Sequence, residues 1–127
     1  MKKAYKILIV DDDAMVRRLY HRILTLKGYS VSTSDTAVRI FNTVAEHVPD
    51  IIIMDNQMPI VSGTEAIRQL KSSERFRSIP VILFSSVSNI SVLAKECGAD
   101  SHLSKLESND HLFAILEDMI ELTHHHA

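Results

Sequence analysis

The chain has little of several features that would place it in a specialised class of protein. Cys97 is the one cysteine among 127 residues, so an internal disulfide is excluded and a small buried hydrophobic side chain is expected there. No apolar run approaches the roughly 20 residues of a membrane span, so no membrane insertion is expected and a cytoplasmic location is predicted. The net charge of −2 gives no reason to expect direct binding to nucleic acid.

The remaining composition is that of an ordinary globular protein, with 46% hydrophobic and 24% charged residues. A chain of 127 residues is long enough to bury a core and is expected to form one domain. We place this domain at residues 1–123. A histidine-containing tail follows at 124–127 and is either native or left from a purification tag.

Short apolar runs rich in β-branched residues predict buried strands, because helices need longer periodic segments. One of them leads straight into Asp55, and a second, half-exposed run alternates apolar and polar side chains. The predicted strands are Lys6–Val10, Tyr29–Thr33, Ile51–Met54, Val81–Phe84 and Ala99–Ser104.

Between these runs the apolar residues recur every three or four positions, which predicts amphipathic helices. Gly28 and Gly98 stand where helices should end, and residues 71–78 read as a polar surface loop. The helices are expected at 14–26, from a cap at Ser34 or Asp35 to 48, from a Ser62–Glu65 capping box to 70, from Ser88 or Asn89 to 97, and from a cap within 108–110 to 120.

Strands and helices thus alternate about five times, with no linker or low-complexity tract between them. Such alternation implies right-handed crossovers and a parallel sheet covered on both faces. The predicted fold class is α/β, with the three-layer architecture of an α/β/α sandwich.

The carboxyl ends of parallel strands share one edge of the sheet, which is where ligands bind in open α/β folds. The residues that follow the predicted strands can therefore be collected without knowing the strand order. They are Asp11-Asp12, Asp55, Ser85-Ser86 and Lys105.

These groups suit a phosphoryl-transfer site. Close carboxylates repel one another unless a cation holds them or their pKa values rise, and oxygen ligands of this kind suit Mg²⁺. A lysine and a serine hydroxyl are what a transferred phosphoryl group needs, and a carboxylate can accept that group as an acyl phosphate. The residues predict Mg²⁺-assisted phosphorylation of Asp55.

Each member of the set also has a plainer interpretation. Asp11–Asp13 could be acids that favour a helix N-terminus, and Ser85-Ser86 could be an ordinary loop or cap. Lys105 alone could be a solvated surface lysine. The occurrence of all of them at strand ends favours the functional interpretation.

With these residues in place, the sequence resembles the receiver domain of two-component response regulators, similar to single-domain chemotaxis-type regulators. The matching stretches, in order and spacing over nearly the whole chain, are Ile7–Asp12, Asp55–Pro59 with Gly63, Pro80–Ser86, and Gly98–Asp100 leading to Lys105. The resemblance implies the (βα)5 flavodoxin-like form of the α/β fold, a doubly wound parallel sheet with strand order 2-1-3-4-5.

The resemblance also implies roles for individual residues. Asp55 would accept a phosphoryl group from a histidine kinase or phosphotransfer protein. Mg²⁺ would be held by the carboxylates of Asp12 and Asp55 and the main-chain carbonyl of Gln57, with Asp11 acting through a metal-bound water.

In the same comparison Ser85 takes the place of the switch hydroxyl and Lys105 that of the lysine that binds the phosphoryl group. The expected protein is a switch rather than an enzyme, with intrinsic phosphotransfer and autodephosphorylation alone. Phosphorylation would change the surface built from residues 88–97, 99–104 and 108–120 and so control a downstream protein or a homodimer.

The chain departs from the family pattern at three positions. Leu106 follows the lysine where receivers usually have a cis-proline, so a trans peptide or a strained loop is expected, since a cis bond before another residue costs about 2.5–4 kcal/mol. His102 replaces the usual aromatic switch residue, and Ser86 the usual alanine. A surface histidine without a switching role is the plain interpretation of His102.

Two other functions remain open at this stage. The departures favour a phosphorylation-independent interaction module with a receiver fold, whereas the acidic residues and Lys105 oppose it. A phosphatase with an aspartyl nucleophile is disfavoured because Gln57 stands where its general acid–base aspartate should be. The chain is either a stand-alone regulator or a receiver from a longer protein.

Overall fold

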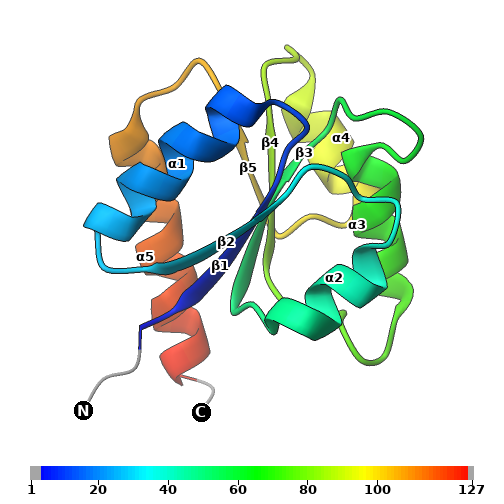
Figure 1. Ribbon diagram of the computed structural model, residues 1–127. Coiled ribbons are helices and arrows are strands. Elements are labelled where there is room, and N and C mark those ends of the chain that lie inside the picture. The colour runs from blue at the N-terminus through cyan, green and yellow to red at the C-terminus, as the bar shows by residue number, and fades with distance from the viewer. Residues whose placement is uncertain (1–3, 126–127) are drawn as a thin grey trace.

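The computed structural model describes residues 4–125, and in this part five strands alternate with five helices (Figure 1). The strands are β1 (Lys6–Val10), β2 (Ser30–Ser34), β3 (Ile51–Asp55), β4 (Val81–Ser85) and β5 (Ser101–Ser104). The helices are α1 (Ala14–Leu26), α2 (Ile40–His47), α3 (Gly63–Ser72), α4 (Ile90–Cys97) and α5 (Asn109–His125). No helix among these residues is long and apolar enough to cross a membrane.

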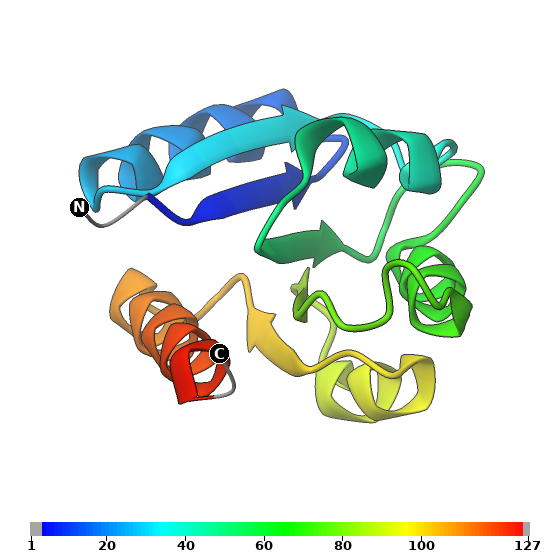
Figure 2. The ribbon, with the colours of Figure 1, turned by 90° about the horizontal axis from the view of Figure 1, so that it is seen from below.

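The strands form one parallel sheet in the order β2-β1-β3-β4-β5, as expected, and Figure 2 shows them side by side in this order. Asp55 is in register with Phe84 on β4, and Ser85 is in register with Ser104 on β5. The register therefore brings the strand ends that carry the predicted site residues to one edge.

Helices cover both faces of the sheet, which confirms the three-layer architecture. Helices α1 and α5 lie on one face, and α2, α3 and α4 lie on the other (Figures 1 and 2). Because successive side chains of a strand point to opposite faces, Ile7 and Ile9 join the core under α1 and α5, whereas Leu8 and Val10 join the other core. All five residues of β3 are buried, as its apolar sequence predicts for a central strand.

Several helix ends follow the predicted capping chemistry. Ser62 caps α3 by accepting a hydrogen bond from the Glu65 N–H at 3.2 Å, the first half of the predicted capping box. Gly28 and Gly98 have φ values of +97° and +85°, which glycine adopts without the steric cost of a Cβ. Cys97 is buried and free, as expected.

The expected start of α2 at Ser34 or Asp35 is wrong. The Ser34 hydroxyl donates instead to the Thr36 carbonyl at 2.9 Å, and the Thr36 hydroxyl oxygen accepts from the Val38 N–H at 3.1 Å. These local bonds hold the backbone in turns, so the helix begins only at Ile40.

The expectation of a polar surface loop at 71–78 is also partly wrong. Helix α3 continues to Ser72, and Phe76 is buried against α2, where its ring stacks on Phe41 with 5.7 Å between ring centroids. Strand β5 begins at Ser101 rather than at Ala99. There is no cis peptide bond between residues 4 and 125, so the bond before Leu106 is trans.

Candidate functional site

Three strand ends converge on one ion-paired cluster. Lys105, just after β5, donates one hydrogen bond to Asp11 Oδ2 and one to Asp55 Oδ1, both at 2.9 Å from Nζ. Asp11 follows β1 directly, and Asp55 ends β3. The parallel register thus places residues that are 94 and 50 positions apart within hydrogen-bonding distance.

Most of the cluster is buried. Asp11 is 1% exposed and Asp55 is 4% exposed, while Asp12 is exposed at the rim. Burial raises the pKa of Asp55, the hydrogen bond from Lys105 lowers it, and the charges of Asp11 and Asp12 raise it, with a net rise. Burial lowers the pKa of Lys105, but its bonds to the two carboxylates outweigh that effect and leave the pKa raised. The plain interpretation of Lys105 as a solvated surface lysine is therefore wrong.

Replacing Lys105 by methionine is expected to destabilise the metal-free protein by about 1–3 kcal/mol, because two buried carboxylates lose the cation between them. The value is below that of a fully buried pair because the Lys105 side chain is 23% exposed. Its raised pKa means that this stabilisation is complete below pH 10.5 and is lost as the pH rises through the folded-state value.

Urea unfolding across pH measures this loss. Lys95→Met removes an exposed lysine of α4 and provides a matched control that should stay within about 0.5 kcal/mol of the wild type. Equal unfolding free energies for Lys105→Met and Lys95→Met at neutral pH would show that the ion pairs do not stabilise the fold.

The donor set of the cluster fits a hard divalent cation. One carboxylate oxygen from each of Asp11, Asp12 and Asp55 lies within 4.8 Å of the others. Two of these residues are buried, and the third opens the group to solvent. Mg²⁺ prefers oxygen ligands and retains several waters, so a half-open carboxylate set of this kind suits it.

The other predicted site residues lie around this cluster. Ser85 is buried at the end of β4, and its Oγ accepts a hydrogen bond from the Val87 N–H at 3.3 Å. Gln57 is exposed in the turn that follows Asp55. The roles of Gln57 as a metal ligand and of Ser85 as the switch hydroxyl stay predictions.

Several residues that shape the site were not predicted from the sequence. Arg17 donates to the Asp11 carbonyl at 2.7 Å, and the Phe84 ring lies beneath Lys105 with its centroid 5.5 Å from Nζ. The Tyr20 ring meets Phe84 edge-on at 5.1 Å. Asp13 caps α1 by accepting bonds from two backbone N–H groups, so the plain interpretation holds for this acid.

The loop between β3 and α3 is tied to Asp55 by close backbone packing. The Asn56 carbonyl accepts hydrogen bonds from the N–H groups of Met58 and Gly63, at 3.1 and 2.9 Å. A Cβ on Gly63 would lie 1.9 Å from the Asp55 carbonyl oxygen. Glycine is needed here because the start of α3 touches the backbone of β3.

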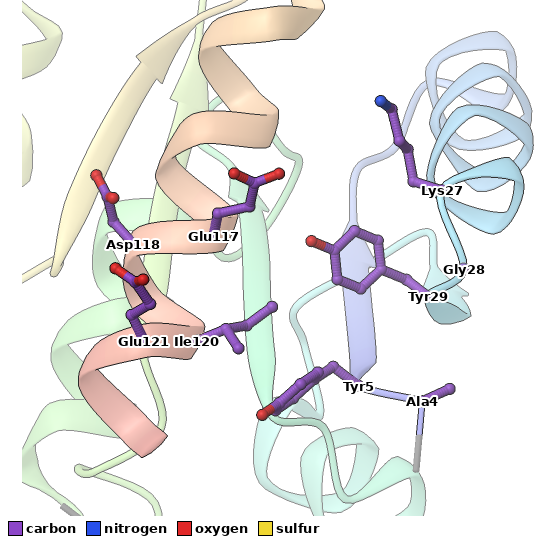
Figure 3. Close-up of a pocket in the computed structure, with 9 residues that line it drawn as sticks. All are labelled: Ala4, Tyr5, Lys27, Gly28, Tyr29, Glu117, Asp118, Ile120 and Glu121. Atoms are coloured by element: carbon purple, nitrogen blue, oxygen red, sulfur yellow. The ribbon is translucent and has the colours of Figure 1, made fainter. Parts of the chain in front are cut away.

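A pocket of about 580 Å³ lies at the opposite edge of the sheet, between the ends of α1 and α5 (Figure 3). Tyr5 and Tyr29 line one side, and Glu117 and Glu121 line the other. None of its lining residues belongs to the cluster described above. The chemistry that suits phosphoryl transfer is therefore at the other edge, around Asp55.

Comparison with known proteins identifies the family. A sequence model of the response regulator receiver domain matches residues 7–117. Response regulator MprA from Mycobacterium sp. (strain KMS) is 32% identical over 120 residues, which cover 93% of this chain and 51% of that protein. MprA from Mycobacterium leprae is also 32% identical over 120 residues, covering 93% of this chain and 52% of its own. The chain thus spans about half the length of the curated relatives that it matches.

Solved structures agree with this assignment. The signal receiver domain of a signal transduction histidine kinase from Syntrophus aciditrophicus has a TM-score of 0.86 and 30% identity, covering 93% of this chain and 91% of its own. Chemotaxis protein CheY4 from Vibrio cholerae shares the fold, with a TM-score of 0.82 and 23% identity over 92% of this chain and 99% of its own. The chain belongs to the response regulator receiver domain family of two-component signalling systems.

Proposed function

We propose that the protein is a phosphorylation switch in which Asp55 accepts a phosphoryl group from a phosphohistidine of a histidine kinase or phosphotransfer protein. The observation that carries the proposal is the buried Asp55 carboxylate, held by Lys105 and grouped with Asp11 and Asp12. Carboxyl groups with raised pKa values are typical of functional sites, so the raised pKa of Asp55 supports a site that binds a cation and accepts a phosphoryl group.

The proposed reaction is an attack of an Asp55 carboxylate oxygen on phosphorus. An O–P bond forms, the N–P bond of phosphohistidine breaks, and its electron pair stays on the imidazole nitrogen. Bound Mg²⁺, held by Asp12, Asp55 and the Gln57 carbonyl with Asp11 acting through water, would supply positive charge to the transferred phosphoryl oxygens.

Lys105 and Ser85 would bind the oxygens of the phosphoryl group once it is on Asp55. The Lys105 ammonium already contacts Asp55 Oδ1, so a small shift brings it to a phosphoryl oxygen. The oxygen of Ser85 accepts from Val87, which leaves the hydroxyl proton to be donated to another phosphoryl oxygen. The backbone N–H of Lys105 also donates to the Ser85 carbonyl at 3.0 Å, so the two residues that would bind the phosphoryl group are linked through their backbones.

The proposed output surface is built from α4, β5 and α5, where the added charge would change the balance between two conformations. Through this surface the protein would bind and control a downstream protein or form a homodimer. His102 on β5 is exposed, as the plain interpretation of this residue predicts.

The exposed position of His102 favours one second candidate, an interaction module that keeps the fold without the phosphorylation switch. In that case the cluster would be a structural ion-pair group, and partner binding would not depend on Asp55.

Amide spectra recorded with Mg²⁺ and beryllofluoride, a mimic of the phosphoryl group, test the two candidates. The switch predicts changes around Asp55, Ser85 and Lys105 that extend into α4 and β5, and none of these in Asp55→Asn. A wild-type spectrum that does not change at saturating beryllofluoride would favour the interaction module.

A further inference from the structure

The loop after Asp55 contains a strained turn centred on Ile60. The Val61 N–H donates to the Pro59 carbonyl at 2.8 Å, which closes a three-residue turn. Ile60 at its centre has a φ of +71°. This is the positive-φ form of the γ-turn, which is rare and strained, and a β-branched residue is among the least suited to it.

The Ile60 side chain adds no packing that would offset this strain. Its side chain is 87% exposed, so it buries almost no apolar surface in return. Val48 is the other non-glycine residue with positive φ in the described part of the chain, and it lies at the end of α2, before β3 begins. A residue that is strained and whose side chain does not pack suggests a role in contact with another molecule.

The position of Ile60 suggests what that role is. Each of the three segments that leave the Asp11, Asp55 and Lys105 cluster carries a highly exposed, large apolar side chain. These are Met15 at 77%, Ile60 at 87% and Leu106 at 84% exposure, and we call them the apolar rim. Asp55 is 4% exposed, so a protein donor must bring its phosphoimidazole past the start of α1 and the two loops that carry the rim.

We propose that Ile60 is a specificity-determining contact for the phosphohistidine-bearing protein, and that its strained turn presents it to an apolar surface around the donor histidine. The inference rests on the proposed function and adds one residue and one partner chemistry to it. A protein donor would bury the apolar rim, whereas a small phosphodonor such as acetyl phosphate would not touch Ile60.

Two glycine variants separate this role from simple relief of strain. Ile60→Gly and Val48→Gly each remove an exposed β-branched residue at positive φ, so both are expected to raise the unfolding midpoint by about 2–4 °C. Ile60→Val keeps an apolar β-branched side chain and serves as the conservative variant.

Two phosphodonors are then compared on the full chain, with labelling of Asp55 as the readout. The donors are acetyl phosphate with Mg²⁺ and the autophosphorylated histidine kinases encoded in the same genome. Ile60→Gly should be labelled by acetyl phosphate within about two-fold of wild type, while transfer from the kinase that labels wild type should fall about ten-fold or more. Val48→Gly and Ile60→Val should stay near the wild-type rate with both donors.

The outcomes distinguish this inference from the proposed function. Wild-type protein that acetyl phosphate does not label would contradict the proposed function itself. If acetyl phosphate labels wild type but kinase transfer is equal in Ile60→Gly, or no kinase transfers at all, the role of Ile60 is refuted. An equal loss with both donors would also refute it, since Ile60 would then act on the geometry of Asp55 instead of on a partner.

Discussion

Replacing Asp55 by asparagine is expected to abolish labelling by acetyl phosphate and, in the absence of metal, to stabilise the fold. Labelling is lost because an amide cannot form the acyl phosphate, and the other carboxylates do not occupy the same position on β3. Stabilisation follows from the raised pKa of Asp55, since burial and the neighbouring acids disfavour its charged form. Asparagine has nearly the same shape without the charge, so a gain of about 1 kcal/mol is expected at neutral pH.

The pH dependence gives this prediction a defined direction. A carboxyl whose pKa is higher in the folded than in the unfolded state costs stability above its folded-state pKa. That cost disappears as the pH falls below the ordinary value of 3.8, so the advantage of Asp55→Asn should shrink toward acid pH. Mg²⁺ should stabilise the wild type more than the variant, because one of the three carboxylates is lost.

Urea unfolding from acid to neutral pH, with and without Mg²⁺, measures both effects. Asp118→Asn provides the control, since it removes an exposed carboxylate of α5 that lines the pocket at the opposite edge of the sheet. Retained labelling of Asp55→Asn by acetyl phosphate would show that another residue is the phosphoacceptor. A lower metal-free stability of the variant would mean that the ion pair with Lys105 outweighs the burial of Asp55.

The edge of the sheet on which the site lies could be predicted because it depends on local signals. A short apolar run ending in Asp55 indicates a buried strand, and parallel strands necessarily end at one edge. Asp11, Ser85 and Lys105 could then be assigned to the same edge without any knowledge of distances. Local capping groups likewise predicted the start of α3 at Ser62.

What could not be predicted depends on contacts between distant segments or on competing local bonds. The ring of Phe84 beneath Lys105 looks like any other apolar residue of a buried strand. The burial of Phe76 needs the partner ring on α2. The late start of α2 depends on side-chain hydroxyl hydrogen bonds that form in place of a helical turn. The positive φ of Ile60 contradicts its own backbone preference, so no propensity could reveal it.

Replacing Gly63 by alanine is expected to cost about 3–5 kcal/mol of unfolding free energy, a large effect for the addition of one methyl group. The added Cβ would lie 1.9 Å from the Asp55 carbonyl oxygen, 2.7 Å from its carbonyl carbon and 2.8 Å from Asn56 Cα. All three are backbone atoms, of Asp55 at the end of fully buried β3 and of Asn56 just after it, so no side chain can rotate to make room. The start of α3 must therefore move away from β3, which weakens the bond from the Gly63 N–H to the Asn56 carbonyl.

Gly28→Ala separates this clash from the general effect of replacing a glycine. Gly28 has positive φ, but a Cβ there would meet nothing within 4 Å, so the expected cost is the left-handed backbone penalty of about 1–2 kcal/mol. Urea unfolding of both variants measures the difference, and an equal cost would show that α3 shifts without strain. Because the contact involves the backbone of Asp55 itself, the folded fraction of Gly63→Ala should also be labelled more slowly by acetyl phosphate. Gly28→Ala should keep the wild-type labelling rate, since Gly28 lies at the opposite edge of the sheet, beside the pocket between α1 and α5.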